Sequence, residues 1–285
     1  MKVKKIGLAL GGGGAKGLAH IGVIKVLEMA GFKISYIAGT SMGALVGGIY
    51  AATGDINYIE KIFLEIAEKY AVSRFHLPKK ENLLFKHQEK VEELLSEKIK
   101  DKKFEDLKLP FQAIATNVKN GEEVILDKGD LLLGIKASIA LPLVFNPVEI
   151  NGSLLMDGGF VNPVPVDVVK KMGSEFVIGV DVQSNWPRIG EEKLSLKNIK
   201  TITAETITAL EYEISKEKLK LADILMKPPV LDYHWNDFYA AKEIIKKGEN
   251  EAEKYIYAIR KETHYPKPKK KPFIAFIDFI SGNSY

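Results

Sequence analysis

The chain has 285 residues, of which 46% are hydrophobic and 27% are charged, and its formal net charge is +4. This length suits one large α/β domain or two small ones, and the composition is that of an ordinary globular protein. The absence of cysteine excludes disulfides, a thiolate nucleophile and a cysteine-based zinc site. The small positive charge does not by itself indicate nucleic-acid binding, and no nucleic-acid partner is expected.

Apolar runs alternate with helical patterns along most of the chain, which predicts strands joined by helices. In chain order, the predicted elements are a strand over 5–10, a helix over 18–31, a strand over 34–41, a helix over 42–54, a helical insertion over about 55–106, strands over 111–118 and 122–127, a helix over 131–140, a hairpin over 145–159, a helix over 164–173, a strand over 175–182, and helices over 196–220 and 236–262 with a strand over 222–229 between them. This order predicts a parallel sheet with helices on its faces.

The predicted domain covers residues 1–262, and a basic and apolar tail follows over 263–285. The tail combines "PKPKKK" with "FIAFIDFI", a pairing typical of peripheral contact with anionic lipid. The alternative is an apolar segment docked back on the domain, or a dimer contact. The first apolar run is too short for a signal peptide, and no run of 18 apolar residues predicts a membrane span. A cytoplasmic location is therefore expected, with peripheral contact to a membrane through the tail as an addition, and the oligomeric state is left open.

Four glycines follow the first strand in "GGGGAKG", residues 11–17. A P-loop would need a Lys and a hydroxyl residue after its last glycine, but Lys16 precedes Gly17 and Leu18 follows it, so this interpretation fails. A dinucleotide fingerprint does match through Gly12, Gly14 and Gly17, but the expected acidic residue at the end of the second strand is missing. The remaining explanation is that bare backbone N–H groups face an oxyanion. Lys16 would then add positive charge near a phosphate head group or lie on the surface.

The second strand ends in "GTSMG", with Ser41 between Gly39 and Gly43. This is the G-x-S-x-G pattern in the strand–turn–helix context of a nucleophile elbow, where the serine hydroxyl is held at the tip of a sharp turn. The N–H of Met42 opens the next helix and faces the same space, so it is a candidate oxyanion donor. Serine as a simple N-cap of that helix is the alternative.

A nucleophilic serine requires a base. His20 lies on the first helix, and neither His234 nor His264 lies in a segment typical of a catalytic loop. Asp157 ends an apolar hairpin strand in "MDGGFVNPVP" and is followed by glycines and rigid prolines, so it is positioned rather than solvated. Asn162 in the same segment is a candidate to orient Asp157 or to cap a turn.

The set "GGGGAKG", "GTSMG" and "DGG" resembles the patatin-like phospholipase family, in particular its small bacterial members. The resemblance covers residues 11–165. It implies a three-layer α/β/α fold with a mainly parallel central sheet and hydrolysis of lipid acyl esters. It also implies a Ser41–Asp157 dyad without histidine and an oxyanion hole from the loop Gly12–Gly14. Residues 157–159 read "DGG", whereas "DGA" is commoner in the family. The residues expected to support these motifs are Gly11, Gly17, Gly39, Gly43, Gly158 and Gly159.

Two other classes of function remain open: a serine hydrolase or acyltransferase acting on small esters or thioesters, and a non-catalytic regulatory module. No cofactor is expected, and because no metal-binding cluster is visible, hydrolysis is expected to be independent of calcium. Apolar residues of the insertion would either wall an acyl groove or pack its own helices: Phe63, Phe75, Leu77, Leu83, Leu84 and Phe85.

Overall fold

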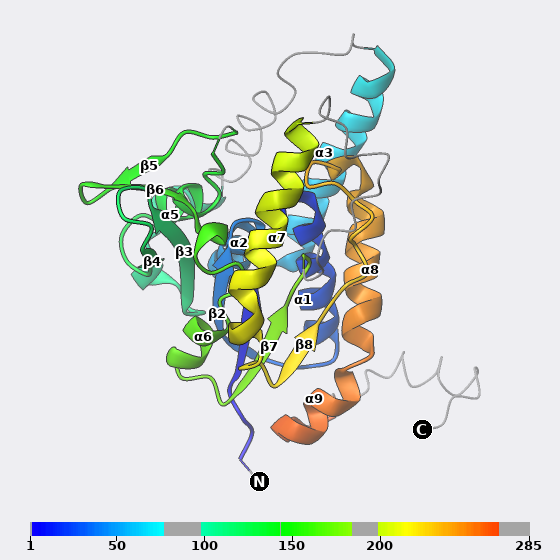
Figure 1. Ribbon diagram of the computed structural model, residues 1–285. Coiled ribbons are helices and arrows are strands. Elements are labelled where there is room, and N and C mark those ends of the chain that lie inside the picture. The colour runs from blue at the N-terminus through cyan, green and yellow to red at the C-terminus, as the bar shows by residue number, and fades with distance from the viewer. Residues whose placement is uncertain (1, 77–97, 143, 184–198, 268–285) are drawn as a thin grey trace.

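The computed structural model describes residues 2–76, 98–142, 144–183 and 199–267 (Figure 1). These residues form an eight-stranded sheet in the order β5-β6-β3-β2-β1-β7-β8, with β4 paired to β3. Its strands are β1 (Ile6–Leu10), β2 (Ile34–Thr40), β3 (Phe111–Asn117), β4 (Glu123–Leu126), β5 (Val148–Ile150), β6 (Ser153–Asp157), β7 (Phe176–Val180) and β8 (Ile224–Met226). The pairs among β1, β2, β3, β7 and β8 are parallel, and those involving β4, β5 and β6 are antiparallel.

Helices cover both faces of this sheet (Figure 1). The α-helices are α1 (Ala19–Met29), α2 (Met42–Thr53), α3 (Ile56–His76), α5 (Leu131–Ser138), α6 (Val166–Lys171), α7 (Ile199–Leu219), α8 (Ala241–Glu253) and α9 (Ile256–Thr263). Helices α1, α2, α3 and α8 pack together on one side, whereas α6 and α7 lie on the other. The predicted three-layer α/β/α arrangement with a mainly parallel sheet is therefore confirmed.

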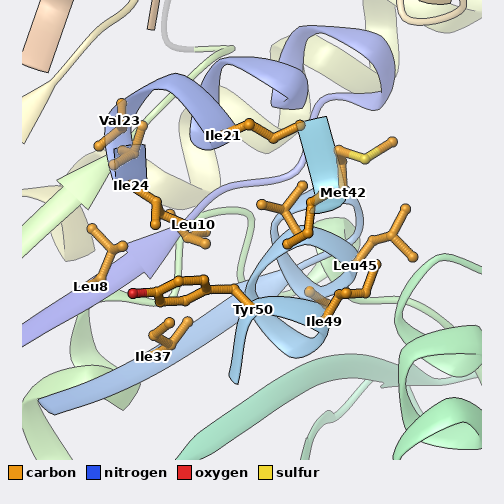
Figure 2. Close-up of a cluster of buried hydrophobic side chains, with 14 of the residues drawn as sticks. Leu8, Leu10, Ile21, Val23, Ile24, Ile37, Met42, Leu45, Ile49 and Tyr50 are labelled. Atoms are coloured by element: carbon orange, nitrogen blue, oxygen red, sulfur yellow. The ribbon is translucent and has the colours of Figure 1, made fainter. Parts of the chain in front are cut away.

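The larger part of the core lies between the sheet and the α1–α2 layer (Figure 2). Leu8 and Leu10 project from β1 into this layer, and Ile37 of β2 lies beside them. Ala9, between the two leucines, belongs to a smaller core under α6. Side chains alternate between the two faces of a strand, so β1 must be apolar throughout because both of its faces are covered.

The first part of the predicted insertion is α3, which continues to His76 and packs against α1, α2 and α8. Phe63 is buried in the main core and stacks on Phe238 with ring centroids 6.4 Å apart. Leu77, Leu83, Leu84 and Phe85 lie outside the described residues, as does the tail from residue 268 onward. No helix in the described ranges is long and apolar enough to cross a membrane.

The stretch predicted as helical over 236–262 is interrupted in the structure. The segment contains the 3-10 turn η6 (Phe238–Ala240), then α8, then a break before α9. At the break, Lys254 and Tyr255 donate their N–H groups to carbonyls only three residues back, on Glu251 and Ala252. These tighter turns change the direction of the helix axis.

Candidate active site

The register of the sheet brings two distant segments to the same level. In the pairing of β2 with β3, Thr40 lies opposite Ile114, and in the pairing of β3 with β6, Asp157 lies opposite Ala115. Ala115 follows Ile114, just as Ser41 follows Thr40. The end of β6 is therefore level with the residue that follows β2, and Asp157 lies beside Ser41.

Ser41 adopts a backbone conformation that L-residues rarely use, with φ 53° and ψ −121°. The chain can turn this sharply because of the two flanking glycines. A Cβ on Gly39 would collide with the carbonyl of Gly43, and a Cβ on Gly43 would collide with the carbonyl of Leu10. Backbone strain of this kind costs about 1–3 kcal/mol and persists where the surroundings enforce it. The strand–turn–helix elbow predicted from "GTSMG" is thus present in the geometry.

The hydroxyl of Ser41 donates a hydrogen bond to Asp157 Oδ2, with Oγ and Oδ2 2.7 Å apart. The other carboxylate oxygen, Oδ1, accepts the N–H of Gly159 at 2.9 Å. The backbone of Asp157 is also fixed, because its N–H donates to the carbonyl of Ala140 and its carbonyl accepts the hydroxyl of Thr116. The carboxylate is therefore held in one orientation, aimed at the serine.

Burial raises the pKa of Asp157 to about 6, although the hydrogen bonds from Ser41 and Gly159 act in the opposite direction. Only 3% of the residue's surface is exposed. A carboxylate in water has a pKa of about 3.9 and is a weak base at neutral pH. The buried position makes Asp157 a stronger proton acceptor while it remains mostly ionised at pH 7.

Ser138, at the end of α5, supports the elbow and was not singled out from the sequence. Its hydroxyl oxygen accepts the N–H of Ser41 at 3.0 Å and its hydroxyl donates to the carbonyl of Ile114 at 2.6 Å. Ser138 is fully buried, so both groups depend on it. A serine near the end of an apolar helix carries no sequence pattern that marks such a role.

The glycine loop packs directly on the elbow. A Cβ on Gly12 would lie 3.3 Å from the Cβ of Ser41, a tight contact, so the absence of a side chain here favours the close approach of the loop to the serine. The N–H of Gly12 donates to the carbonyl of Pro163 at 3.0 Å. Gly13 and Gly14 have φ values of 147° and 55°, which favour glycine. Within the described residues, no hydrogen bond occupies the N–H of Gly14 or of Met42.

The side chain of Gln183, which follows β7, reaches the same loop. In the amide orientation that satisfies both neighbours, the oxygen accepts the N–H of Gly13 at 3.0 Å. The amide nitrogen then donates to Glu211 Oε2 on α7. Burial, followed by the negative charges of Asp157 and Asp181, raises the pKa of Glu211 to about 8, against the opposite effect of Lys16. Neither Gln183 nor Glu211 was singled out from the sequence, because no short motif connects them to the serine.

The histidines have other contacts. His20 is fully buried, and its Nε2 donates to the carbonyl of Gly11 at 2.7 Å. Burial lowers the pKa of His20 to about 4, so the ring is neutral and anchors the glycine loop. His264 caps α9 with φ 59°, and the N–H of His234 donates to Asp237. In the described part of the chain, no histidine ring is hydrogen-bonded to Ser41.

Asn162 does not touch Asp157 with its amide. The amide nitrogen donates to Glu123 Oε1 and to Asp167 Oδ1, at 2.6 and 2.9 Å, and its backbone carbonyl accepts the hydroxyl of Thr40. This buried residue ties the segment after Asp157 to β2, β4 and α6. Across residues 2–76, 98–142, 144–183 and 199–267, no cluster of three or more His, Asp or Glu side chains could hold a metal ion.

Residues 8–170 match the family model described as patatin-like phospholipase, which is more than half of the chain. The chain therefore belongs to the patatin-like phospholipase family, which confirms the resemblance in its motifs.

Among similar curated proteins, lysophospholipase nte1 of Aspergillus niger is 29% identical over 291 residues, covering 94% of this chain and 19% of the fungal protein. An uncharacterized NTE family protein of Mycobacterium bovis is 35% identical over 181 residues, covering 64% of this chain and 50% of that protein. The chain thus spans about a fifth of the length of the fungal relative and half that of the mycobacterial one. Among solved structures, VipD from Legionella pneumophila is 14% identical with a TM-score of 0.46, covering 90% of this chain and 67% of VipD.

Proposed function

We propose that the protein is a serine acyl hydrolase that cleaves lipid ester bonds with a dyad of Ser41 and Asp157. The observation that carries this proposal is the 2.7 Å hydrogen bond from the Ser41 hydroxyl to the buried, oriented carboxylate of Asp157. Ser41 makes this bond from the strained backbone conformation of the elbow. A role of Ser41 as a helix cap would not explain its strained backbone. A role of Asp157 in an ion pair would not explain its burial, because no salt bridge to it is present among the described residues. Membership of the patatin-like phospholipase family supports the same reaction class.

In the proposed reaction, Ser41 Oγ attacks the ester carbonyl carbon while its proton passes to Asp157 Oδ2. The tetrahedral intermediate collapses when the bond to the leaving oxygen breaks, and that oxygen takes the proton from Asp157. Water then attacks the acyl-Ser41 ester and gives a proton to Asp157. Release of the fatty acid returns that proton to Ser41 Oγ, so both residues are regenerated.

The oxyanion of each tetrahedral intermediate needs N–H donors near Ser41. In the resting structure the N–H groups of Gly12 and Gly13 are engaged by Pro163 and Gln183. We therefore assign the donor role to the N–H of Met42, at the start of α2, and to that of Gly14 in the loop. Gly12 contributes by its close approach to Ser41, and Gly13 by its link to Gln183.

The substrate class is inferred from the family and from the similarity to the Aspergillus niger relative, which is named a lysophospholipase. A lipid ester with one or more long acyl chains is the proposed substrate. Peripheral membrane contact through the tail 263–285 is part of this proposal and rests on its basic and apolar sequence. Activity on short esters or thioesters alone is the competing possibility.

The test is the release of p-nitrophenol from esters of increasing acyl length, with and without EDTA. Wild type is compared with Ser41→Ala, with Asp157→Asn, and with Asp106→Asn as a control at an exposed carboxylate. The proposal predicts that the two dyad variants lose activity by at least about 10³-fold, that the control and the EDTA sample do not, and that longer acyl chains lower KM. Full activity of Ser41→Ala would overturn the proposal, and a preference for the shortest ester would overturn the lipid assignment.

A further inference from the structure

Glu211 lies between the two loops that form the proposed active site. Its Oε2 accepts a hydrogen bond from the amide of Gln183, whose oxygen in turn accepts the N–H of Gly13. Its Oε1 occupies the space that a Cβ on Gly159 would need. Gly159 is the residue whose N–H orients Asp157. One carboxyl group on α7 therefore contacts both the turn that holds the base and, through one amide, the glycine loop.

The surroundings of Glu211 are unusual for a surface helix. As a residue it is partly exposed, but its carboxyl points inward toward Asp157, Asp181 and Lys16. It lines a small pocket beside Gly12 together with Asp181, Gln183 and Tyr212. By contrast, Glu213 on the same helix is exposed and pairs with Lys216 at 2.7 Å. The helix thus directs one glutamate inward and places its neighbour in solvent.

We propose that Glu211 is a positioning residue of the hydrolase site, which holds the glycine loop through Gln183 at the distance from Ser41 that oxyanion binding requires. This inference rests on the proposed function and deepens it. The chain of contacts runs from Glu211 through Gln183 to Gly13, next to Gly14, which carries a proposed oxyanion donor. Displacement of such a donor by about 1 Å can lower a rate by about 10²-fold.

The same contact explains why the motif reads "DGG". An alanine at residue 159 would place its methyl group on Glu211 Oε1, so a chain with Glu211 in this position requires glycine there. The clash involves the end of a flexible side chain rather than backbone, so a Gly159→Ala variant is expected to fold with Glu211 displaced. A Cβ at residue 159 would also lie 3.3 Å from Asp157 Oδ1, and the experiment must separate that effect.

The first arm of the experiment compares Glu211→Ala, Glu211→Gln and the matched control Glu213→Gln on one p-nitrophenyl ester. Glu211→Ala removes the anchor of Gln183 and is expected to lower kcat by about 10- to 100-fold with KM within about twofold of wild type. Glu211→Gln keeps an acceptor for the Gln183 amide and is expected to retain kcat within about threefold at pH 7. Equal kcat for Glu211→Ala and wild type would overturn the proposal.

The second arm is the pH profile of kcat, which a merely structural role would not change. Since burial raises the pKa of Glu211 to about 8, its carboxyl becomes charged above that pH, beside Asp157 and the glycine loop. An added negative charge there opposes the developing oxyanion, so the wild-type rate should fall as the pH rises through about 8. The groups that face this carboxyl are Asp157, Asp181, Lys16 and the Gln183 amide. Glu211→Gln should lose the alkaline fall, whereas Glu213→Gln should keep it, and an alkaline fall that persists in Glu211→Gln would contradict the role.

The third arm is a double-mutant cycle between Gly159→Ala and Glu211→Ala. If the alanine acts by displacing Glu211, the double variant should be no slower than the slower single variant. Additive losses would show that the methyl group acts on Asp157 instead and would overturn the link between the two residues. Ser41→Ala distinguishes failure of this proposal from failure of the proposed function: if Ser41→Ala is inactive while Glu211→Ala matches wild type, only the role of Glu211 is wrong.

Discussion

At Asp157, burial and hydrogen bonding act on one carboxyl group in opposite directions. Burial disfavours the charged form, whereas the hydroxyl of Ser41 and the N–H of Gly159 favour it. Burial has the larger effect, and the resulting pKa of about 6 brings a weak base closer to neutral pH. One consequence concerns the rate of reaction and another concerns the stability of the fold.

For the rate, the carboxylate must be ionised to accept the proton of Ser41. We expect kcat/KM to fall as the pH drops through about 6, approaching about tenfold per pH unit below it. The measurement is a profile of kcat/KM between pH 4.5 and 8 on a soluble ester, in wild type and in the exposed-site variant Asp106→Asn. Both should show the same acid fall, and a midpoint near 4 would mean that the base is not a buried carboxylate.

For stability, the sign follows from the raised pKa in the folded state. Folding favours protonated Asp157, so stability is fully present below the unfolded pKa of about 4 and decreases as the pH rises through the folded pKa of about 6. Asp157→Asn carries no charge at any pH. We expect it to be more stable than wild type by about 1–3 kcal/mol at pH 8 and to lose that advantage below pH 4.

Urea unfolding of both proteins at pH 4 and pH 8 tests this expectation. The Asp106→Asn variant serves as a control, since its carboxylate is exposed and should show no such difference. An advantage for Asp157→Asn that is equal at the two pH values would contradict the electrostatic explanation.

Ser138 is the other residue on which the serine depends. Ser138→Ala leaves the N–H of Ser41 and the carbonyl of Ile114 without their partner, which costs about 1–3 kcal/mol of stability in a buried site. It also frees the elbow, so we expect kcat to fall by about tenfold or more. Ser174→Ala, which removes a hydroxyl bound to the carbonyl of Val169 away from the dyad, is the matched control. It should lower stability alone, and loss of activity in both variants would remove the special role of Ser138.

Among the elements, the contact between α1 and α8 connects the glycine loop to the rest of the helical layer. The two helices approach through glycines, because a Cβ on Gly22 would meet the backbone of Ile245 and Glu249, and a Cβ on Gly248 would meet the carbonyl of Ala19. A short 3-10 helix over Gly14–Leu18 connects the loop to α1, and His20 of α1 holds Gly11. The position of the loop therefore depends on how closely α8 packs.

We expect Gly248→Ala to push α8 from α1 and to destabilise the fold by about 2 kcal/mol or more, because the methyl group meets backbone that cannot rotate away. Activity per folded molecule should fall as well, since α1 carries the loop. Asn250→Ala, on the exposed side of the same helix, should change stability by less than about 0.5 kcal/mol. Chemical unfolding and assays at a temperature where both variants are folded provide the comparison. A neutral Gly248→Ala would mean that the helix contact is loose.

At the scale of the whole molecule, the register of the sheet brings together residues from segments that are distant in the sequence. Ser41 follows β2, Asp157 ends β6 at the level of Ser41, and the glycine loop follows β1 and packs on Ser41, so the register of the sheet brings all three together. Residues 268–285 lie outside the described part of the chain. None of the proposed site residues belongs to them, so their proposed role in lipid contact can be tested apart from the chemistry.

A chain ending at residue 267 is expected to keep the wild-type kcat on a short soluble ester and to bind vesicles containing an anionic lipid less tightly than the full chain, by about tenfold or more. Co-sedimentation with anionic and with neutral vesicles measures the difference. A full-length variant with the lysines of "PKPKKK" replaced by glutamine separates charge from apolar contact. Equal binding of all three proteins to anionic vesicles would remove the tail from the proposal.

The sequence alone determined the elements and the chemical type of the site. Apolar periodicity located the strands, Gly54 ended α2 in a left-handed conformation with φ 65°, and Asn151–Gly152 formed the predicted hairpin turn. These features depend on neighbours in the chain, so local pattern is sufficient. The residues of the proposed dyad could be named for the same reason, since each lies in a short motif whose glycines serve a local turn.

The groups that surround the proposed dyad, by contrast, depend on the tertiary structure. Ser138, Gln183 and Glu211 reach the elbow and the glycine loop across the sheet and from a separate helix, through contacts that no periodicity records. The raised pKa of Asp157 is also a tertiary property, because it arises from water excluded by segments far away in the chain. The break between α8 and α9 was missed because the residues there favour helix and no Gly or Pro marks the end. Sequence patterns report on local backbone preference, whereas burial and long-range contact depend on how the elements pack.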